Sequence, residues 1–257
     1  MKVGDITQAL EQFAPLSIQE GWDNSGLCIG APEDEVHGVL LGFDCTPELI
    51  DEAVAKGCDL VVTHHPLIFR GLKRIRGGEP VADAVIKAVR AGVAVYAAHT
   101  TADKVIAGVS GAMARRLELG DVALMQDEGG YGLGAVGTLP RPMTGEEAVA
   151  YVKEKFGLQT VRASKPVARV EKVAVCGGSG SSEIDAARAT GAQLYVSGDI
   201  SYHHFFQPEG FLVLDIGHFE SEVDIVGILF KVIREKFPTF AVRISDNLGR
   251  SNPVRYC

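Results

Sequence analysis

The chain lacks the features that mark several large protein classes. No apolar run approaches the roughly 18 residues of a membrane span, and no signal peptide is recognisable at the N-terminus. The five cysteines are odd in number and lack the paired spacing of a zinc knuckle, so they make a poor disulfide framework. We therefore expect a cytoplasmic protein with reduced cysteines.

The chain also lacks an excess of basic residues. Its net charge of −8 argues against a general nucleic-acid binder. It has no low-complexity tract and no obvious flexible linker, while 46% hydrophobic and 23% charged residues are ordinary for a globular protein. Its 257 residues suffice for one large domain or two small ones.

Against this background, two adjacent histidines stand out. The apolar run from Leu60 to Val62 predicts a buried strand, and His64 and His65 follow at its end. Pro66 biases His65 towards an extended backbone. Ligands of α/β proteins gather at the carboxyl ends of strands, so the pair is either a set of metal ligands or a polar strand cap.

An internal repeat relates the two halves of the chain. Residues 49–63 align without a gap to residues 183–197, and each segment follows an expected strand, Val39 to Phe43 or Val173 to Cys176. The repeat predicts a strand, a helix and a second strand in each half. Two related α/β halves are the expected fold.

Each half continues into a histidine that precedes a carboxylate by four residues. His99 is followed by Asp103, and His218 by Glu222. If a helix starts at such a histidine, both side chains lie on one face. We expect a first half, 1–125, carrying His64, His65 and Asp103, and a second half, 126–257, carrying His218 and Glu222, with an approximate boundary and terminal segments that cross over.

Local signals place further elements. Thr46 and Pro47 open a helix, and Thr144 with Glu147 forms a capping box for another. The glycine-rich segment from Gly129 to Leu139 has a strand-like pattern.

The repeated motifs assemble a metal-binding constellation. Imidazole with carboxylate suits zinc, iron or manganese and not a calcium site built of oxygens alone. The set is too large for one tetrahedral ion and about right for two ions bridged by a carboxylate, which activate water for hydrolysis. The candidate ligands are His64, His65, His99, Asp103, His218 and Glu222.

Three histidines have two possible roles each. His99 is either a ligand or a support for Asp103. His203 and His204 follow the second repeat, and either could carry a proton beside the metals or lie at the surface.

Two segments are candidates for substrate binding. Trp22, the only tryptophan, lies in a polar loop beside Asp23 and either lines a pocket or plugs the edge of the core. Lys73 lies in a basic loop with Arg70, Arg74 and Arg76, which could hold a phosphate or be solvated surface charge.

Four motifs together resemble those of the Nif-three-like proteins, whose members commonly carry the name GTP cyclohydrolase I type 2 homologue. The resemblance covers essentially the whole chain. The motifs are Gly21-Trp22-Asp23-Asn24-Ser25-Gly26-Leu27, Thr63-His64-His65-Pro66-Leu67, His99-Thr100-x-x-Asp103 and Gly217-His218-x-x-x-Glu222.

The resemblance implies a dinuclear metal centre between two α/β domains, in a ring-shaped homohexamer. Its ligands would be His64, His65, Asp103, His218 and Glu222, with Asp103 or Glu222 bridging. Two features depart from it or complicate it: Asp199 stands where many members have glutamate, and Glu220 is an acidic neighbour of Glu222.

The implied activity is metal-dependent hydrolysis, with GTP ring opening as the named candidate and a phosphoester as another substrate. His203 or His99 would move a proton, and Trp22, Asp23 and Lys73 would contact substrate. The alternative is a metal carrier or interaction module without turnover.

Overall fold

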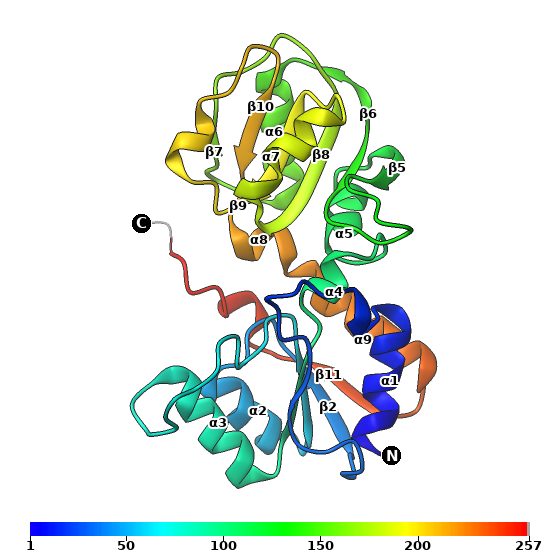
Figure 1. Ribbon diagram of the computed structural model, residues 1–257, viewed down its shortest axis with the longest axis vertical. Helices are drawn as coiled ribbons and strands as arrows, with labels where there is room; N and C mark the ends of the chain where they lie inside the picture. The colour runs from blue at the N-terminus through cyan, green and yellow to red at the C-terminus, as the bar shows by residue number, and fades with distance from the viewer. Residues whose placement is uncertain (256–257) are drawn as a thin grey trace. The chain divides into compact units, whose positions relative to one another are not determined.

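The computed structural model describes residues 1–255 and gathers them into two α/β units (Figure 1). The first unit comprises Met1–Ala102 together with the segment from Ile225 onward. The second unit comprises Asp103–Asp224.

This division differs from the boundary expected near residue 125. Asp103 begins the second unit, and the C-terminal segment returns to the first, as the expected crossing of terminal segments allows. The return has a physical cause, because β11 (Ala241–Ile244) pairs in parallel with β2 (Gly38–Leu41). The edge of the first sheet is thus completed by the last strand of the chain.

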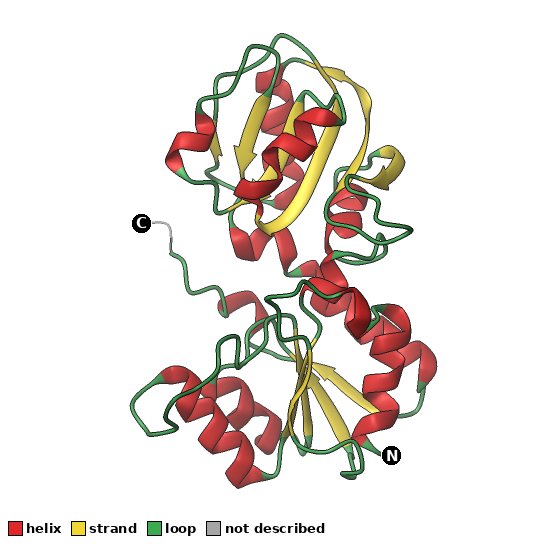
Figure 2. Cartoon of the chain, in the orientation of Figure 1, coloured by secondary structure: helices red, strands yellow, loops and turns green. Residues whose placement is uncertain are grey.

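The first unit is a sheet with helices on its faces (Figure 2). Along the chain its elements are α1 (Val3–Phe13), η1 (Leu16–Ile18), β1 (Gly26–Ile29), β2, α2 (Pro47–Ala55), β3 (Leu60–Thr63), α3 (Pro80–Ala91), β4 (Ala94–Ala97), α4 (Thr100–Asp103), α9 (Asp224–Lys236), β11 and η4 (Leu248–Arg250). Helices α4 and α9 each have one end in the second unit.

The three central strands of this sheet, β2, β3 and β4, are buried on both faces. The strand order is β1-β4-β3-β2-β11, and all neighbours run parallel except β1, which is antiparallel to β4. Leu40, Val61 and Val95 pack in one cluster with Ile50 of α2 and Val85 of α3. Alternate strand residues face the other side, where α1 and α9 lie (Figure 1), so an almost continuous apolar run is required.

The second unit has the same design around its own sheet. Its elements are α5 (Val109–Arg116), β5 (Gly120–Leu124), β6 (Ala135–Met143), α6 (Gly145–Phe156), β7 (Arg162–Ala163), β8 (Val170–Ser179), η2 (Gly180–Glu183), α7 (Ile184–Ala189), β9 (Leu194–Gly198), η3 (Tyr202–Phe205), β10 (Leu212–Asp215) and α8 (His218–Glu222). The strand order is β5-β6-β8-β9-β10-β7.

Strand alternation also decides which helices cover which face of this sheet. Val175 and Val196 pack with Val152 of α6, whereas Ala174 and Tyr195, one residue earlier on the same strands, pack with α7. The period of two residues in a strand therefore divides the core into two layers.

The internal repeat is confirmed by strand pairing. In the first sheet Val39 lies opposite Leu60, and in the second Val173 lies opposite Leu194, which is the pairing that the sequence alignment predicts. In both units the third strand, β4 or β10, then pairs in parallel with the second. The two related α/β halves are a finding of the structure.

The structure bears on the expected state of the cysteines and on membrane-spanning helices. Cys28, Cys45, Cys58 and Cys176 are free thiols, as expected, and Cys257 lies outside the described residues. Within residues 1–255, no helix has the length and apolar character required to cross a membrane.

The C-terminal segment is fastened to α2 through one carboxylate. Glu52 accepts hydrogen bonds from Ser245 Oγ (2.6 Å) and the Asp246 backbone N–H (2.9 Å) and pairs with Lys56 Nζ (2.8 Å). Burial favours the protonated form, but the hydrogen bonds from Lys56, Ser245, Asp246 and Asn247 outweigh it and lower the pKa of Glu52 to about 2. Glu52 is therefore ionised in the folded protein.

This shift predicts an acid-sensitive attachment. Because the pKa of Glu52 is lower in the folded than in the unfolded chain, its stabilisation is complete above pH 4.5 and lost as the pH falls towards about 2. We expect Glu52→Gln to lower the unfolding free energy by at most about 3 kcal/mol at neutral pH, and to flatten its decline in acid. Urea unfolding across this pH range measures both effects; parallel curves for the two proteins would contradict the assignment.

Candidate functional site

The first unit brings three histidines together. His64 and His65 follow β3 and His99 follows β4, two parallel neighbours whose carboxyl ends meet at one edge of the sheet. Ring centroids lie 4.9 Å apart for His64 and His65, and 5.4 and 5.3 Å from these to His99. One ring nitrogen from each lies within 4.8 Å of the others, so the three can hold a metal ion.

The two adjacent histidines are oriented through Nδ1. His64 is fully buried, and its Nδ1 lies 2.8 Å from the Ala98 carbonyl oxygen. A carbonyl oxygen only accepts, so His64 Nδ1 carries the proton and Nε2 presents a lone pair. His65 Nδ1 lies 2.7 Å from Asp44 Oδ1, and Asp44 lies three residues beyond the end of β2, the strand that pairs with β3. This is the outer contact typical of metal-ligating histidines.

His99 is held by a buried carboxylate. Its Nδ1 lies 2.6 Å from Asp23 Oδ1, and Asp23 Oδ2 also accepts hydrogen bonds from Thr100 Oγ1 (2.5 Å) and Ser25 Oγ (2.7 Å). Burial raises the pKa of Asp23, but the hydrogen bonds and the charge of His99 outweigh it, so the pKa lies well below its usual range. The Asp23 side chain has no exposed surface. It is placed to orient His99, and contact between Asp23 and substrate stays a prediction.

Trp22 lies at the surface and does not plug the core. It is 60% exposed, and its ring centroid lies 5.9 Å from that of Phe69 and 6.1 Å from that of His99. Of the two interpretations that the sequence left open, the core-edge plug is wrong.

The second unit carries a histidine and a carboxylate on one short helix. Gly217 precedes α8 with a φ of 96°, a conformation that glycine adopts readily, and His218 and Glu222 lie one turn apart. His218 Nε2 lies 3.0 Å from Glu222 Oε2, and His218 Nδ1 lies 2.8 Å from Asp199 Oδ2. Asp199 thus orients His218 as Asp44 orients His65.

A close backbone approach makes room for the Glu222 carboxylate. A Cβ at Gly178 would lie 2.3 Å from Glu222 Oε1, and Gly178 has a φ of 66°. The Gly178 backbone N–H donates to Ser221 Oγ at 2.9 Å. The glycine-rich end of β8 is therefore a cradle for α8.

Asp103 and Glu222 are both close to one buried thiol. Burial, followed by the charges of Asp103, Glu183 and Glu222, raises the pKa of Cys176. Cys176 is therefore a neutral neighbour of the acidic side chains. Histidine and carboxylate groups of this composition are able to bind a metal ion.

The two histidines proposed as proton carriers after the second repeat, His203 and His204, lie on η3 of the second unit. His203 is exposed on η3, where its ring lies 5.3 Å from Tyr202 and 6.4 Å from Phe206. His204 Nδ1 contacts Ser201 Oγ at 2.7 Å. None of these contacts is with a carboxylate, whereas His99 contacts the carboxylate of Asp23.

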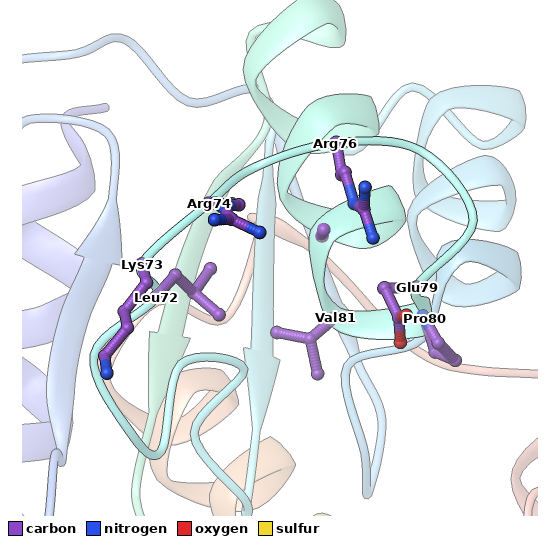
Figure 3. Close-up of a pocket in the computed structure, with 8 residues that line it drawn as sticks. Leu72, Lys73, Arg74, Arg76, Glu79, Pro80 and Val81 are labelled. Atoms are coloured by element: carbon purple, nitrogen blue, oxygen red, sulfur yellow. The ribbon is translucent and has the colours of Figure 1, made fainter.

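Lys73 lines a basic pocket in the first unit. The loop that carries Lys73, Arg74 and Arg76 curves over the start of α3 and encloses about 510 Å³ (Figure 3). Glu79 is the acidic side chain among the lining residues. The pocket thus has an excess of positive charge.

Sequence reasoning missed Asp44 as a partner of His65. The available signal was the strand expected from Val39 to Phe43, which Asp44 follows: this strand and the histidine strand are parallel neighbours, so their ends adjoin. Phe69 carried no such signal, because its contact with Trp22 depends on how two loops fold.

Comparisons with known proteins agree over the whole chain. A model of the family described as Duf34/NIF3 (NGG1p interacting factor 3) matches residues 1–249. A Clostridium perfringens protein named GTP cyclohydrolase 1 type 2 homolog is 32% identical over 242 residues, 92% of each chain. A Streptomyces coelicolor protein of the same name is 36% identical over 232 residues, 86% of this chain and 81% of the relative. The crystal structure of the Staphylococcus aureus hypothetical protein SA1388 is similar with a TM-score of 0.92 and 26% identity, covering 100% of this chain and 99% of that one.

Proposed function

Because this chain belongs to the Duf34/NIF3 family, we propose that it binds two divalent metal ions and hydrolyses a nucleotide or phosphoester. The proposed ions are zinc, iron or manganese. The proposed ligands are His64, His65, Asp103, His218 and Glu222.

One observation carries this proposal: the candidate histidines are oriented in the same way. His64, His65, His99 and His218 each direct Nδ1 to a carbonyl or carboxylate oxygen, at 2.6 to 2.8 Å. We propose Nε2 of each ring as the coordinating atom; His218 Nε2 lies 3.0 Å from Glu222 Oε2, which belongs to another proposed ligand. Histidines whose second ring nitrogen donates to a carbonyl or carboxylate oxygen are typical of metal sites. Histidines that only cap a strand do not require such an oxygen partner.

Two of the proposed ligands lie near the points where the chain passes from one unit to the other. The chain passes between units after Ala102 and after Asp224, so Asp103 and Glu222 each lie within two residues of a crossing. We propose that these carboxylates complete the two metal sites, one of them bridging.

The proposed roles of the other residues follow from their surroundings. Bound metal would supply an activated water and stabilise developing negative charge. Asp23 orients His99, which moves a proton, and the exposed His203 is the second candidate for that role. Trp22 and Lys73 bind substrate.

The proposed setting of this activity comes from the family resemblance. We propose a cytoplasmic homohexamer that does not act on nucleic acid, and whose substrate is a small molecule. Light scattering on the purified chain measures the oligomeric state.

A non-catalytic role is the alternative. The family description names an interacting factor and no reaction, which favours a metal carrier or an interaction module. A carrier would release its metal to an apo acceptor protein, whereas a hydrolase would retain it through many turnovers.

The orientation of His218 provides the test of the metal site. We expect about two equivalents of metal per chain, measured by elemental analysis of protein purified without chelator. Asp199→Ala should weaken metal binding by about 10- to 100-fold in a competition assay with a chelating dye. Asp199→Glu should restore most of it, because a carboxylate again accepts from Nδ1. Absence of metal in the wild-type protein, even after adding zinc, iron or manganese, would overturn the proposal.

A further inference from the structure

The carboxylate that orients His218 is exposed to water, unlike the one that orients His99. The side chain of Asp199 is 57% exposed, whereas that of Asp23 has no exposed surface. A hydrogen bond that is open to solvent competes with hydrogen bonds to water, so it contributes little to orientation by itself. The contact between Asp199 and His218 therefore depends on how firmly the backbone holds the two residues.

The backbone has a positive φ both at Asp199 and just before His218. The φ of Asp199 is 48°, and that of Gly217 is 96°. A residue with a side chain keeps such a conformation only where surrounding contacts hold it. The two turns are also in close contact, because a Cβ at Gly198 would lie 2.8 Å from the backbone nitrogen of His218. The groups that fix these two turns therefore decide where the His218 ring lies.

A single buried carboxylate is bonded to both turns. Asp215, the last residue of β10, is 5% exposed. Its Oδ2 accepts from the Ile200 backbone N–H, and its Oδ1 accepts from the Gly217 backbone N–H, each at 2.9 Å. These two N–H groups belong to the residues that adjoin Asp199 and His218 in the chain. Asp215 thus closes a ring of contacts that contains the orienting pair.

Arg162 compensates the charge of Asp215 and holds one of the turns from a second side. It lies opposite Asp215 where β7 pairs with β10 (Figure 1). Its Nη2 donates to Asp215 Oδ2 and, at 2.9 Å, to the Ile200 carbonyl oxygen, so Ile200 is bonded through both its N–H and its C=O. The guanidinium carbon also lies 5.4 Å from the centre of the Phe205 ring. Because a buried carboxylate is costly without a charged partner, the arginine makes this acceptor possible.

The internal repeat shows that the fold does not require the pair of Arg162 and Asp215. Ala97 of β4 stands where Asp215 stands in β10, since each lies opposite the last residue of the repeated segment in its own half. Ala97 pairs with Gly26 of the antiparallel strand β1, as Asp215 pairs with Arg162 of the antiparallel strand β7. The first unit thus forms the same strand pairing without charge. The charged pair is not part of the common design, and a local role must account for it.

We propose that Asp215 and Arg162 are positioning residues, which hold Asp199 and His218 in the observed geometry and on which the affinity of His218 for metal depends. The inference rests on the proposed metal site and adds two residues that act through the backbone of the two turns. Loss of an outer contact of a metal-binding histidine typically weakens metal binding 10- to 100-fold. Loss of the group that fixes this contact should act in the same direction.

Asp215→Asn tests the positioning role. The amide presents an N–H group where one of the two backbone N–H groups donates to a carboxylate oxygen in the wild type, so one turn loses its acceptor. We expect zinc binding to weaken by about 10- to 100-fold in a competition assay with a chelating dye. Asp185→Asn is the matched control. Asp185 also pairs with an arginine of the second unit, 2.7 Å from Arg188 Nη2, but its side chain is 84% exposed, and this variant should bind zinc like the wild type.

A second measurement does not depend on metal. In metal-free protein the contact with Asp199 should protect the ring proton on His218 Nδ1 from exchange and give it a resolved signal in proton NMR spectra. The chain has seven histidines, and His218→Gln identifies the signal by removing it. Asp215→Asn should broaden or remove the signal, and Asp185→Asn should leave it unchanged. A purely structural role of Asp215 would lower the urea midpoint of unfolding and leave this signal in the folded protein.

Two further variants guard against a folding failure and against an indirect effect. Arg162→Gln changes a side chain that is 60% exposed and removes hydrogen bonds from one turn, so it should weaken zinc binding by about fivefold. If Asp215→Asn does not fold, this variant carries the same two measurements. The double variant Asp199→Ala and Asp215→Asn should lose less affinity than the product of the two single losses, because both residues act through His218.

Three results would overturn the inference. They are wild-type zinc affinity in both the Asp215 and the Arg162 variants, an unchanged His218 ring proton in Asp215→Asn, and losses that multiply in full in the double variant. Failure of the proposed function gives a different result, in which the wild-type protein has no zinc affinity and the His218 signal still responds to Asp215→Asn. The positioning of His218 then stands, and the metal site falls.

Discussion

Glu222→Gln is expected to remove most of the bound metal while leaving the fold intact. Glu222 is 3% exposed, and glutamine has the same shape without the charge. A neutral amide is a poor ligand for zinc, iron or manganese beside imidazoles. We expect the metal content to fall from about two equivalents to below one, because a bridging carboxylate serves both ions.

The stability of the variant should depend on metal much less than that of the wild type. Glutamine at position 222 keeps the shape of Glu222 and can still contact His218 Nε2, which lies 3.0 Å from Glu222 Oε2 in the wild type, so the metal-free variant should melt close to the temperature of the metal-free wild type. Added metal should raise the melting temperature of the wild type strongly and that of the variant weakly. Thermal melts with and without chelator measure this difference.

Glu220→Gln is the matched control. Glu220 lies on the same helix, α8, and is partly exposed, so the chemical change is identical and only the position differs. This variant should keep its metal. Metal lost from the Glu220 variant and retained by the Glu222 variant would show that the wrong carboxylate was assigned.

The sequence was sufficient to predict where two helices begin. Thr46 does cap α2, its Oγ1 accepting from the Leu49 N–H at 3.3 Å, and Thr144 with Glu147 forms the expected capping box of α6. These signals are local, since donor and acceptor lie three residues apart, and the sequence therefore displays them directly.

The glycine-rich segment shows where local patterns mislead. A strand was expected from Gly129 to Leu139, yet β6 begins only at Ala135. Gly129 and Gly130 have φ values of 94° and 97°, and their N–H groups donate to Asp127 Oδ1 at 3.0 and 2.7 Å. The glycines thus close a turn around an aspartate, a use of glycine that hydrophobic periodicity does not register.

The candidate ligands could be found from the repeat, but the residues that orient them could not. His65 and Asp44 are 21 residues apart, and His99 and Asp23 are 76 apart. Such pairs follow from strand order and loop folding, which one sequence does not specify. Asp199 is a partial exception, because it lies two residues after the second repeat segment, at a strand end that the sequence displays directly.

His99→Gln is expected to abolish most of the hydrolytic turnover, more than any change at His203. His99 has a buried carboxylate partner in Asp23, with support from Thr100 and Ser25, whereas the ring contacts of the exposed His203 are with Tyr202 and Phe206. A positioned acid or base contributes about 100- to 10,000-fold to a rate. We expect His99→Gln to lose at least about 100-fold and His203→Gln much less.

Asp23→Asn decides how His99 acts. The asparagine keeps the shape of Asp23 but loses the charge that holds His99 Nδ1. The lowered pKa of Asp23 shows that the native site strongly favours the ionised carboxylate. If His99 moves a proton, Asp23→Asn should lower turnover on nucleotide or phosphoester substrates by about 100-fold with metal content unchanged. If His99 instead binds metal with His64 and His65, both variants should lose metal in proportion to activity. Turnover and metal content measured on the same preparations separate the two roles, and full activity in both variants would exclude His99 from the reaction.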